Sequence, residues 1–285
     1  MHSTSRQIFT VVWSGVLVLV LTLFVQGIWT GLLVANLTTS PRFPWAVFVM
    51  ALLLWLMWQY LNGKWWPQST SEARWRNLRA RGLSGEVFAW ALLAGLLSIA
   101  ALTGFWIVLF QLAKVPGNTL PDFSKYPQLS VALMLVMASV VGGVTEEAGF
   151  RGYFQGLLER IVNGSVAILI ASLVMAPAHA LTQGFVWPTL VFYLFVDVML
   201  GAMACLTNSI LPGIVVHAIG LLTFFTLVWP NDASRRLTGN GATEGWFWIH
   251  CAQAIIFTAL AIIAFKRLGK VTQIPGAATT PILAK

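Results

Sequence analysis

Charged residues are scarce in this chain, and their scarcity decides the class of protein. Only 9% of the 285 residues are Asp, Glu, Lys or Arg, whereas a soluble domain usually carries about 25%. Hydrophobic residues make up 58% of the chain. This composition excludes an ordinary water-soluble domain. It predicts an all-α, polytopic transmembrane helix bundle that forms a single integral membrane domain over residues 1–285.

Cysteine is also scarce, which excludes a disulfide-stabilised scaffold. The two cysteines, Cys205 and Cys251, both lie in apolar runs. Their spacing matches no metal-binding or redox motif. We therefore expect both to be packing thiols without a chemical role.

Acidic residues are the rarer of the two charge signs, and the net charge is +8. The basic residues cluster beside hydrophobic runs: Arg6 precedes the first run, five lie in segment 62–86, and three lie in 266–270. Such clusters are typical of topology signals and of contacts with anionic lipids, so we expect no nucleic-acid partner. The positive-inside rule places all three regions, and both termini, in the cytoplasm and requires an even number of spans.

Segment 62–86 combines arginines with Trp65, Trp66, Trp75 and Leu78. This pattern predicts a short helix on the inner membrane surface, and a solvated basic loop is the alternative.

Long apolar runs predict eight membrane spans, because about 20 apolar residues cross the hydrocarbon core. We expect the tail, residues 271–285, to be disordered. The eight predicted spans are 8–33, 43–61, 87–112, 128–160, 165–183, 186–206, 209–229 and 246–265.

One cluster of charges interrupts the fourth run, where Glu146, Glu147 and Arg151 follow one another closely. A charge at membrane depth costs about 3 kcal/mol or more, so it is expected only where it pairs, faces water or is functional. Segment 144–160 remains largely apolar and contains no proline. We therefore expect 128–160 to form one long helix that carries these charges within the bilayer.

Two histidines lie at a similar predicted depth on later spans. A helix rises about 1.5 Å per residue, so Glu146 lies roughly 20 Å above Arg160 at the inner surface. By the same measure, His179 lies roughly 24 Å above the inner end of its own span, and His217 lies roughly 14 Å above the inner end of its span. All three residues therefore reach the middle of the bilayer. The sequence predicts that they meet at one cavity.

The two glutamates are expected to differ in role. Glu147 and Arg151 are four residues apart on one helical face and are expected to neutralise each other. Glu146 points about 100° away and can face the cavity. A carboxylate beside an imidazole can deprotonate water, and a second imidazole can stabilise the oxyanion of amide hydrolysis. Asp197 is expected to have a buried, hydrogen-bonded or Arg-paired role.

Other interpretations of these residues remain open. The charges could form a structural ion pair, and the histidines could be packing residues. Glu146, His179 and His217 could instead bind zinc, although no His-Glu-x-x-His pair is present. A proton-coupled transporter using Glu146 and Asp197 is a further alternative, which the lack of inverted repeats disfavours.

At these residues the chain resembles the CAAX-protease and bacteriocin-processing family of intramembrane proteases, over about 128–222. The Glu-Glu-x-x-x-Arg motif is met by Glu146, Glu147 and Arg151. The family's second motif is an aromatic residue followed four positions later by His, and here Met175 precedes His179.

The third motif of the family is His with Asn or Asp four residues later. Here His217 is followed by Leu221. The resemblance implies that Glu146 and His179 activate water and that His217 helps to stabilise the oxyanion. Leucine cannot donate a hydrogen bond, and one lost oxyanion donor costs about 3 kcal/mol of transition-state stabilisation.

We therefore predict an intramembrane endopeptidase that cleaves membrane-associated proteins or peptides, with catalytic Glu146, His179 and His217 supported by Glu147 and Arg151. The expected mechanism uses no cofactor, and zinc is the alternative. The expected location is a bacterial plasma membrane, with lipids as further partners. The alternative function is a non-catalytic binding or bacteriocin-immunity protein on the same fold.

Overall fold

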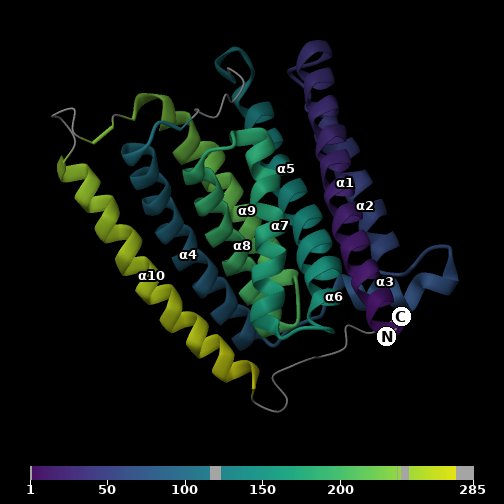
Figure 1. Ribbon diagram of the computed structural model, residues 1–285. Helices are drawn as coiled ribbons and strands as arrows, with labels where there is room; N and C mark the ends of the chain where they lie inside the picture. Colours follow the sequence, from purple (N-terminus) through teal and green to yellow (C-terminus); the bar gives the residue numbers. More distant parts are fainter. Residues whose placement is uncertain (1, 116–122, 236, 239–243, 274–285) are drawn as a thin grey trace.

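The computed structural model describes residues 2–115, 123–235, 237–238 and 244–273, and every regular element in these ranges is helical (Figure 1). The helices are α1 (His2–Thr39), α2 (Trp45–Leu61), α3 (Ser71–Leu78), α4 (Gly85–Leu112), α5 (Gln128–Glu146), α6 (Gly156–Leu158), α7 (Gly164–Gln183), α8 (Trp187–Thr207), α9 (Leu211–Thr223) and α10 (Glu244–Thr272).

The predicted class of protein is confirmed. Six helical segments of the described chain are long and apolar enough to cross a membrane. Two shorter apolar helices, Trp45–Leu61 and Gly164–His179, bring the total to the eight predicted segments. The protein is an integral, multi-pass membrane protein. The six longer segments are Phe9–Thr39, Gly85–Leu112, Gln128–Leu158, Trp187–Thr207, Leu211–Asp232 and Gly245–Thr272.

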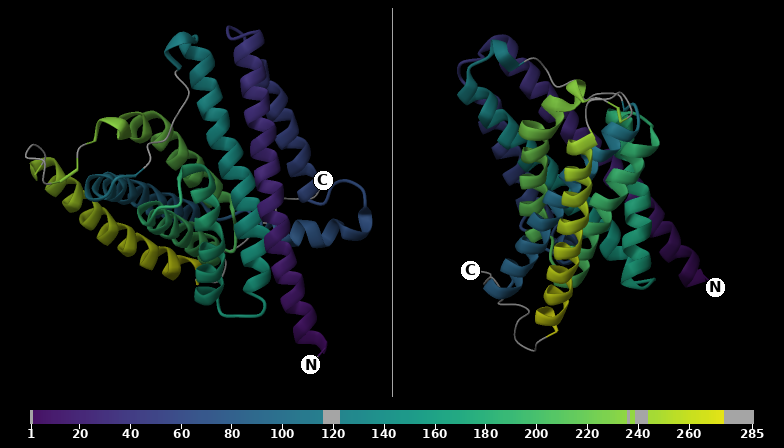
Figure 2. Two further views of the ribbon diagram at one scale, coloured as in Figure 1. Left: turned by 45° about the horizontal axis from the view of Figure 1, so that its top comes forward. Right: turned by 90° about the vertical axis from the view of Figure 1, so that its left-hand side faces the viewer.

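The helices form a bundle in which α1 and α10 lie on opposite flanks (Figures 1 and 2). Helix α10 packs along α4, α7 packs along α8, and α5 packs along α9 and α1. The beginning of α1, the connection that contains α3, and the end of α10 lie at the same end of the bundle (Figure 1). This arrangement agrees with an even number of crossings. The compartment that this end faces stays a prediction.

The fourth predicted span is one continuous helical rod, Gln128–Leu158, as expected. Its hydrogen bonding is not uniform, because residues Glu147–Gln155 between α5 and α6 form a π-helix. We call this stretch the π segment. Helices of this kind are rare and often occur at functional sites. The sequence did not predict the π segment, because it contains glycines but no proline that would mark a break.

Helix α5 and helix α9 approach each other closely because α5 carries glycine at the contact. A Cβ added to Gly143 would lie 2.9 Å from the carbonyl oxygen of Ile214 and 3.2 Å from the amide nitrogen of Ala218. Small residues permit such close packing between membrane helices. This contact places Glu146 on α5 beside His217 on α9.

Segment 62–86 contains a short helix, α3, as predicted. The position of this helix on the inner membrane surface stays a prediction. Within α3, Trp75 is exposed and Leu78 is buried against the bundle. Two arginines of this segment contact protein groups, although we expected them to contact lipids. Arg74 is buried and donates to the carbonyl of Tyr60 at 2.6 Å, and Arg79 pairs with Glu159 at 3.0 Å. These arginines attach the connection to the bundle.

The last helix extends further than expected. Helix α10 continues to Thr272, so the first two residues of the predicted disordered tail are helical. Residues 274–285 lie outside the described residues.

Candidate active site

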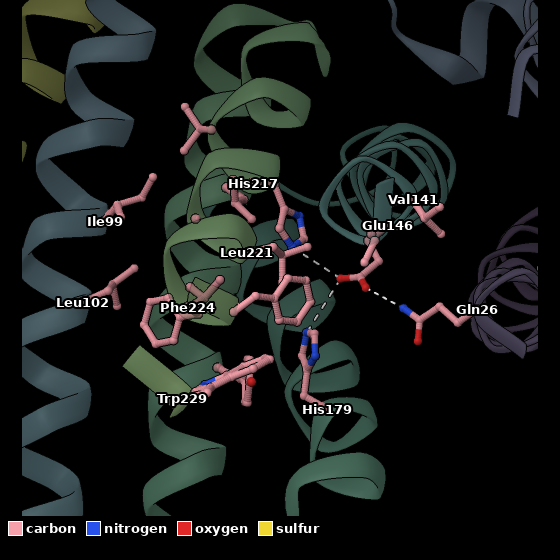
Figure 3. A pocket seen from close by; sticks show the side chains of 18 of the residues that line it. Gln26, Ile99, Leu102, Val141, Glu146, His179, His217, Leu221, Phe224 and Trp229 are labelled. Carbon is pink, nitrogen blue, oxygen red and sulfur yellow. Dashed lines mark hydrogen bonds and ion pairs between the residues drawn. The ribbon is translucent and has the colours of Figure 1, made fainter. Parts of the chain in front are cut away.

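Glu146, His179 and His217 come together from α5, α7 and α9, as the depth argument predicted (Figure 3). Glu146 Oε2 lies 3.6 Å from His217 Nε2 and 3.9 Å from His179 Nε2. Glu146 and His217 are buried, with 4% and 8% of their surfaces exposed. The three side chains line one cavity of about 320 Å³.

Glu146 has a partner that sequence reasoning missed. Gln26 of α1 donates from Nε2 to Glu146 Oε1 at 2.7 Å (Figure 3). The other oxygen, Oε2, is buried and has no hydrogen-bond partner among the described residues. The only available signal was a lone amide side chain within the apolar run 8–33. Its contact with Glu146 spans 120 positions of sequence, so no local pattern reveals it.

Glu147 holds the other side of His217. Glu147 Oε1 lies 2.9 Å from His217 Nδ1 and 3.5 Å from Arg151 Nη1. An ionised carboxylate can only accept, so it requires the proton on Nδ1 of the imidazole. The predicted Glu147–Arg151 pair is present. The interpretation that this pair simply neutralises itself is incomplete, because Glu147 also orients His217.

Arg151 also has a second acidic partner. Its Nη2 lies 2.5 Å from Asp197 Oδ1 on α8, closer than its contact with Glu147. Asp197 therefore has the Arg-paired position expected for it. The ion-pair network runs from His217 through Glu147 and Arg151 to Asp197, and it connects α9, the π segment and α8. This network is entirely buried, so its members stabilise one another without help from solvent.

His179 is held by an aromatic ring that lies outside its own motif. The ring of Tyr193 on α8 stacks on the imidazole with centroids 4.0 Å apart and planes 14° apart. Met175, which occupies the motif's aromatic position, instead packs in a core cluster with Phe150 and Phe154. Tyr193 therefore supplies an aromatic contact to His179 from a different helix. Sequence reasoning missed it because tyrosine is unremarkable in an apolar span.

The rest of the cavity wall is mainly apolar. Leu221 lies on this wall and follows His217 by one helical turn (Figure 3). A Cβ added to Gly142 would come within 2.5 Å of Leu221 Cδ1, so glycine at 142 leaves room for the leucine. Other apolar side chains on the wall include Ile99, Leu102, Val141, Phe224 and Trp229.

Glu146, His179 and His217 are also the residues of the alternative zinc site. In the described parts of the chain, no group of three or more His, Cys, Asp or Glu side chains has an arrangement that could hold a metal ion. Gln26 binds Glu146 Oε1 and Glu147 binds His217 Nδ1. These contacts leave Glu146 Oε2 and the two histidine Nε2 atoms facing one another. The zinc alternative therefore stays a prediction.

Fold and site together define a polytopic membrane protein in which a buried carboxylate and two imidazoles share a cavity. Residues 128–222 match the family model described as Type II CAAX prenyl endopeptidase Rce1-like. For this third of the chain, the match confirms the resemblance to the CAAX-protease and bacteriocin-processing family of intramembrane proteases. Comparisons with curated proteins and with solved structures found no match.

Proposed function

We propose that this protein is an intramembrane endopeptidase that hydrolyses peptide bonds of membrane-associated proteins or peptides, in the plasma membrane of a bacterium. The observation that carries the proposal is the position of Glu146 Oε2, 3.6 and 3.9 Å from two imidazole nitrogens at the wall of a cavity. The match of residues 128–222 to a protease family supports the same conclusion.

The separations suit a shared water molecule. Each is longer than a direct hydrogen bond but shorter than two hydrogen bonds of about 2.8 Å laid end to end. One water can therefore contact Glu146 Oε2 and His179 Nε2 at once. In the proposed first step, Glu146 accepts a proton from this water while the water oxygen bonds to the peptide carbonyl carbon.

The second step breaks the carbon–nitrogen bond. The proton held by Glu146 passes to the leaving amine as the tetrahedral intermediate collapses to a carboxylic acid and an amine. His217 Nδ1–H already donates a hydrogen bond to Glu147, so His217 can also donate to the oxyanion from Nε2 only when its ring carries both protons. The proposed mechanism therefore uses His217 as an imidazolium, with Glu146 and Glu147 both close enough to stabilise that charge.

The first test is substitution of the proposed base. We expect Glu146→Gln, or His179→Ala, to abolish proteolysis, because neither variant can activate the water as proposed. The measurement is comparative peptidomics of membranes that contain the wild type, each variant, or no protein. Glu86→Gln is the matched control, because Glu86 is exposed in the first turn of α4, away from the cavity.

Folding must be checked in parallel by size-exclusion chromatography and thermal unfolding in detergent. Cleavage that persists in both folded variants would contradict the proposal. A non-catalytic binding or immunity protein is the second candidate, and Leu221 on the cavity wall favours it because leucine cannot donate to an oxyanion. Such a protein would keep its cellular phenotype in the Glu146→Gln variant.

A further inference from the structure

We infer that Gln26 is a positioning residue for Glu146, so that α1, which lies outside the segment matched to the protease family, forms part of the active site. The inference rests on the proposed function, since it assigns Gln26 a task in activating the attacking water. Gln26 and Glu146 both line the cavity.

The hydrogen bond decides which carboxylate oxygen faces the imidazoles. The terminal torsion of glutamate is broad and roughly two-fold, so rotamer preference alone does not orient the two oxygens. Gln26 Nε2 binds Oε1 at 2.7 Å, and Oε2 is thereby directed toward His179 and His217 (Figure 3). Without this donor the carboxylate plane can rotate, and the base loses its alignment with the water.

An amide suits this task better than a charged side chain would. A lysine or arginine at position 26 would pair with Glu146 and reduce its ability to accept a proton. The neutral amide donates one hydrogen bond to an ionised oxygen, and it leaves the negative charge available on the other. Arg151, the arginine of the buried cluster, is instead held by Glu147 and Asp197.

The packing of α1 fixes where Gln26 lies. Gly15, Val18 and Gln26 follow one another at spacings of three and eight residues, which keeps them on one face of the helix. A Cβ added to Gly15 would lie 2.8 Å from Phe154 Cε2, and one added to Gly149 would lie 2.6 Å from Val18 Cγ1. Helix α1 therefore rests directly on the π segment, the element that begins immediately after Glu146.

Thr30 provides a matched control on the same helix. It lies one turn beyond Gln26 and lines the same cavity. Its hydroxyl donates to the carbonyl of Gln26 on its own helix at 2.9 Å. Substitution of Thr30 therefore alters the cavity wall and the packing of α1 but leaves the bond between the Gln26 side chain and Glu146 in place.

The test compares Gln26→Met, which keeps side-chain length without the donor, with Gln26→His, which restores an N–H, and with Thr30→Val. The full-length protein is reconstituted in liposomes and assayed on a peptide that the wild type is found to cleave. We expect Gln26→Met to lower kcat about tenfold or more with KM and thermal unfolding unchanged. Gln26→His should recover part of kcat. Thr30→Val alters the cavity wall but keeps the donor, so it should lower kcat much less than Gln26→Met does.

Wild-type kcat in Gln26→Met, or an equal loss in Thr30→Val, would overturn the inference. A different result, cleavage by the Glu146→Gln variant, would contradict the proposed function itself. A readout that needs no substrate is the rate at which dicyclohexylcarbodiimide, which labels protonated carboxyl groups, modifies Glu146. That rate should rise severalfold in Gln26→Met, because the ionised carboxylate loses a donor; an unchanged rate would also overturn the inference.

Discussion

Glu146 and His217 each have one side-chain atom held by a neighbour and one atom that faces the other polar side chains of the site. Gln26 binds Glu146 Oε1 and leaves Oε2 toward the imidazoles. Glu147 binds His217 Nδ1 and leaves Nε2 toward Glu146. Preorganised groups of this kind need little rearrangement when charge develops during a reaction. The adjacent glutamates therefore have different tasks, although both belong to one motif.

Leu221 is one of two positions, with Met175, at which this chain departs from the family pattern, and it gives a prediction. We expect Leu221→Asn to raise kcat about tenfold or more, because an added oxyanion donor can be worth that much or more. The measurement is peptide hydrolysis by purified protein in liposomes. Leu221→Met, which keeps an apolar side chain, is the control. Equal rates for the two variants would show that position 221 does not contact the oxyanion.

At the scale of the elements, close contacts at glycine bring the side chains of the candidate site within reach of one another. Gly143 allows α5 to approach the backbone of α9, and Gly149 allows α1 to approach the π segment. The π segment begins between these two contacts and contains the charged residues Glu147 and Arg151. Helix positions, rather than flexible side chains, thus determine the distances in the site.

Substitution of Gly143 tests the close approach of α5 and α9. We expect Gly143→Ala to lower the free energy of unfolding by about 1–3 kcal/mol, because the new methyl group meets backbone atoms that cannot move aside. Gly27→Ala is the control, since a Cβ at Gly27 would meet nothing within 4 Å. Unfolding in detergent, followed by circular dichroism, measures both. Equal stability of the two variants would contradict the close approach of α5 and α9.

At the scale of the whole molecule, the arrangement of basic segments agrees with a defined orientation. The connection between α2 and α4 lies at the same end of the bundle as the end of α10, where Lys266, Arg267 and Lys270 are found (Figure 1). Basic residues are retained on the cytoplasmic side during insertion. We therefore predict that this end of the bundle faces the cytoplasm.

A reporter tests this orientation directly. We expect alkaline phosphatase, which is active only outside the cytoplasm, to be inactive when fused after Lys270. It should be active when fused after Lys114, which follows the end of α4. That end of α4 lies at the opposite end of the bundle (Figure 1). Green fluorescent protein at the same two positions should show the reverse. Phosphatase activity at both positions would exclude the predicted topology.

The linear sequence was sufficient for the class of protein, the helical segments and the three residues that meet at the cavity. These follow from the cost of placing charge in hydrocarbon, which leaves few sites where Glu146, His179 and His217 can be accommodated. The partners of these residues could not be predicted from the sequence. The contacts of Gln26 and Tyr193, and the position of the π segment, depend on how helices that are distant in sequence rotate and approach one another. Packing between helices determines this arrangement, and the residue pattern within any one helix does not show it.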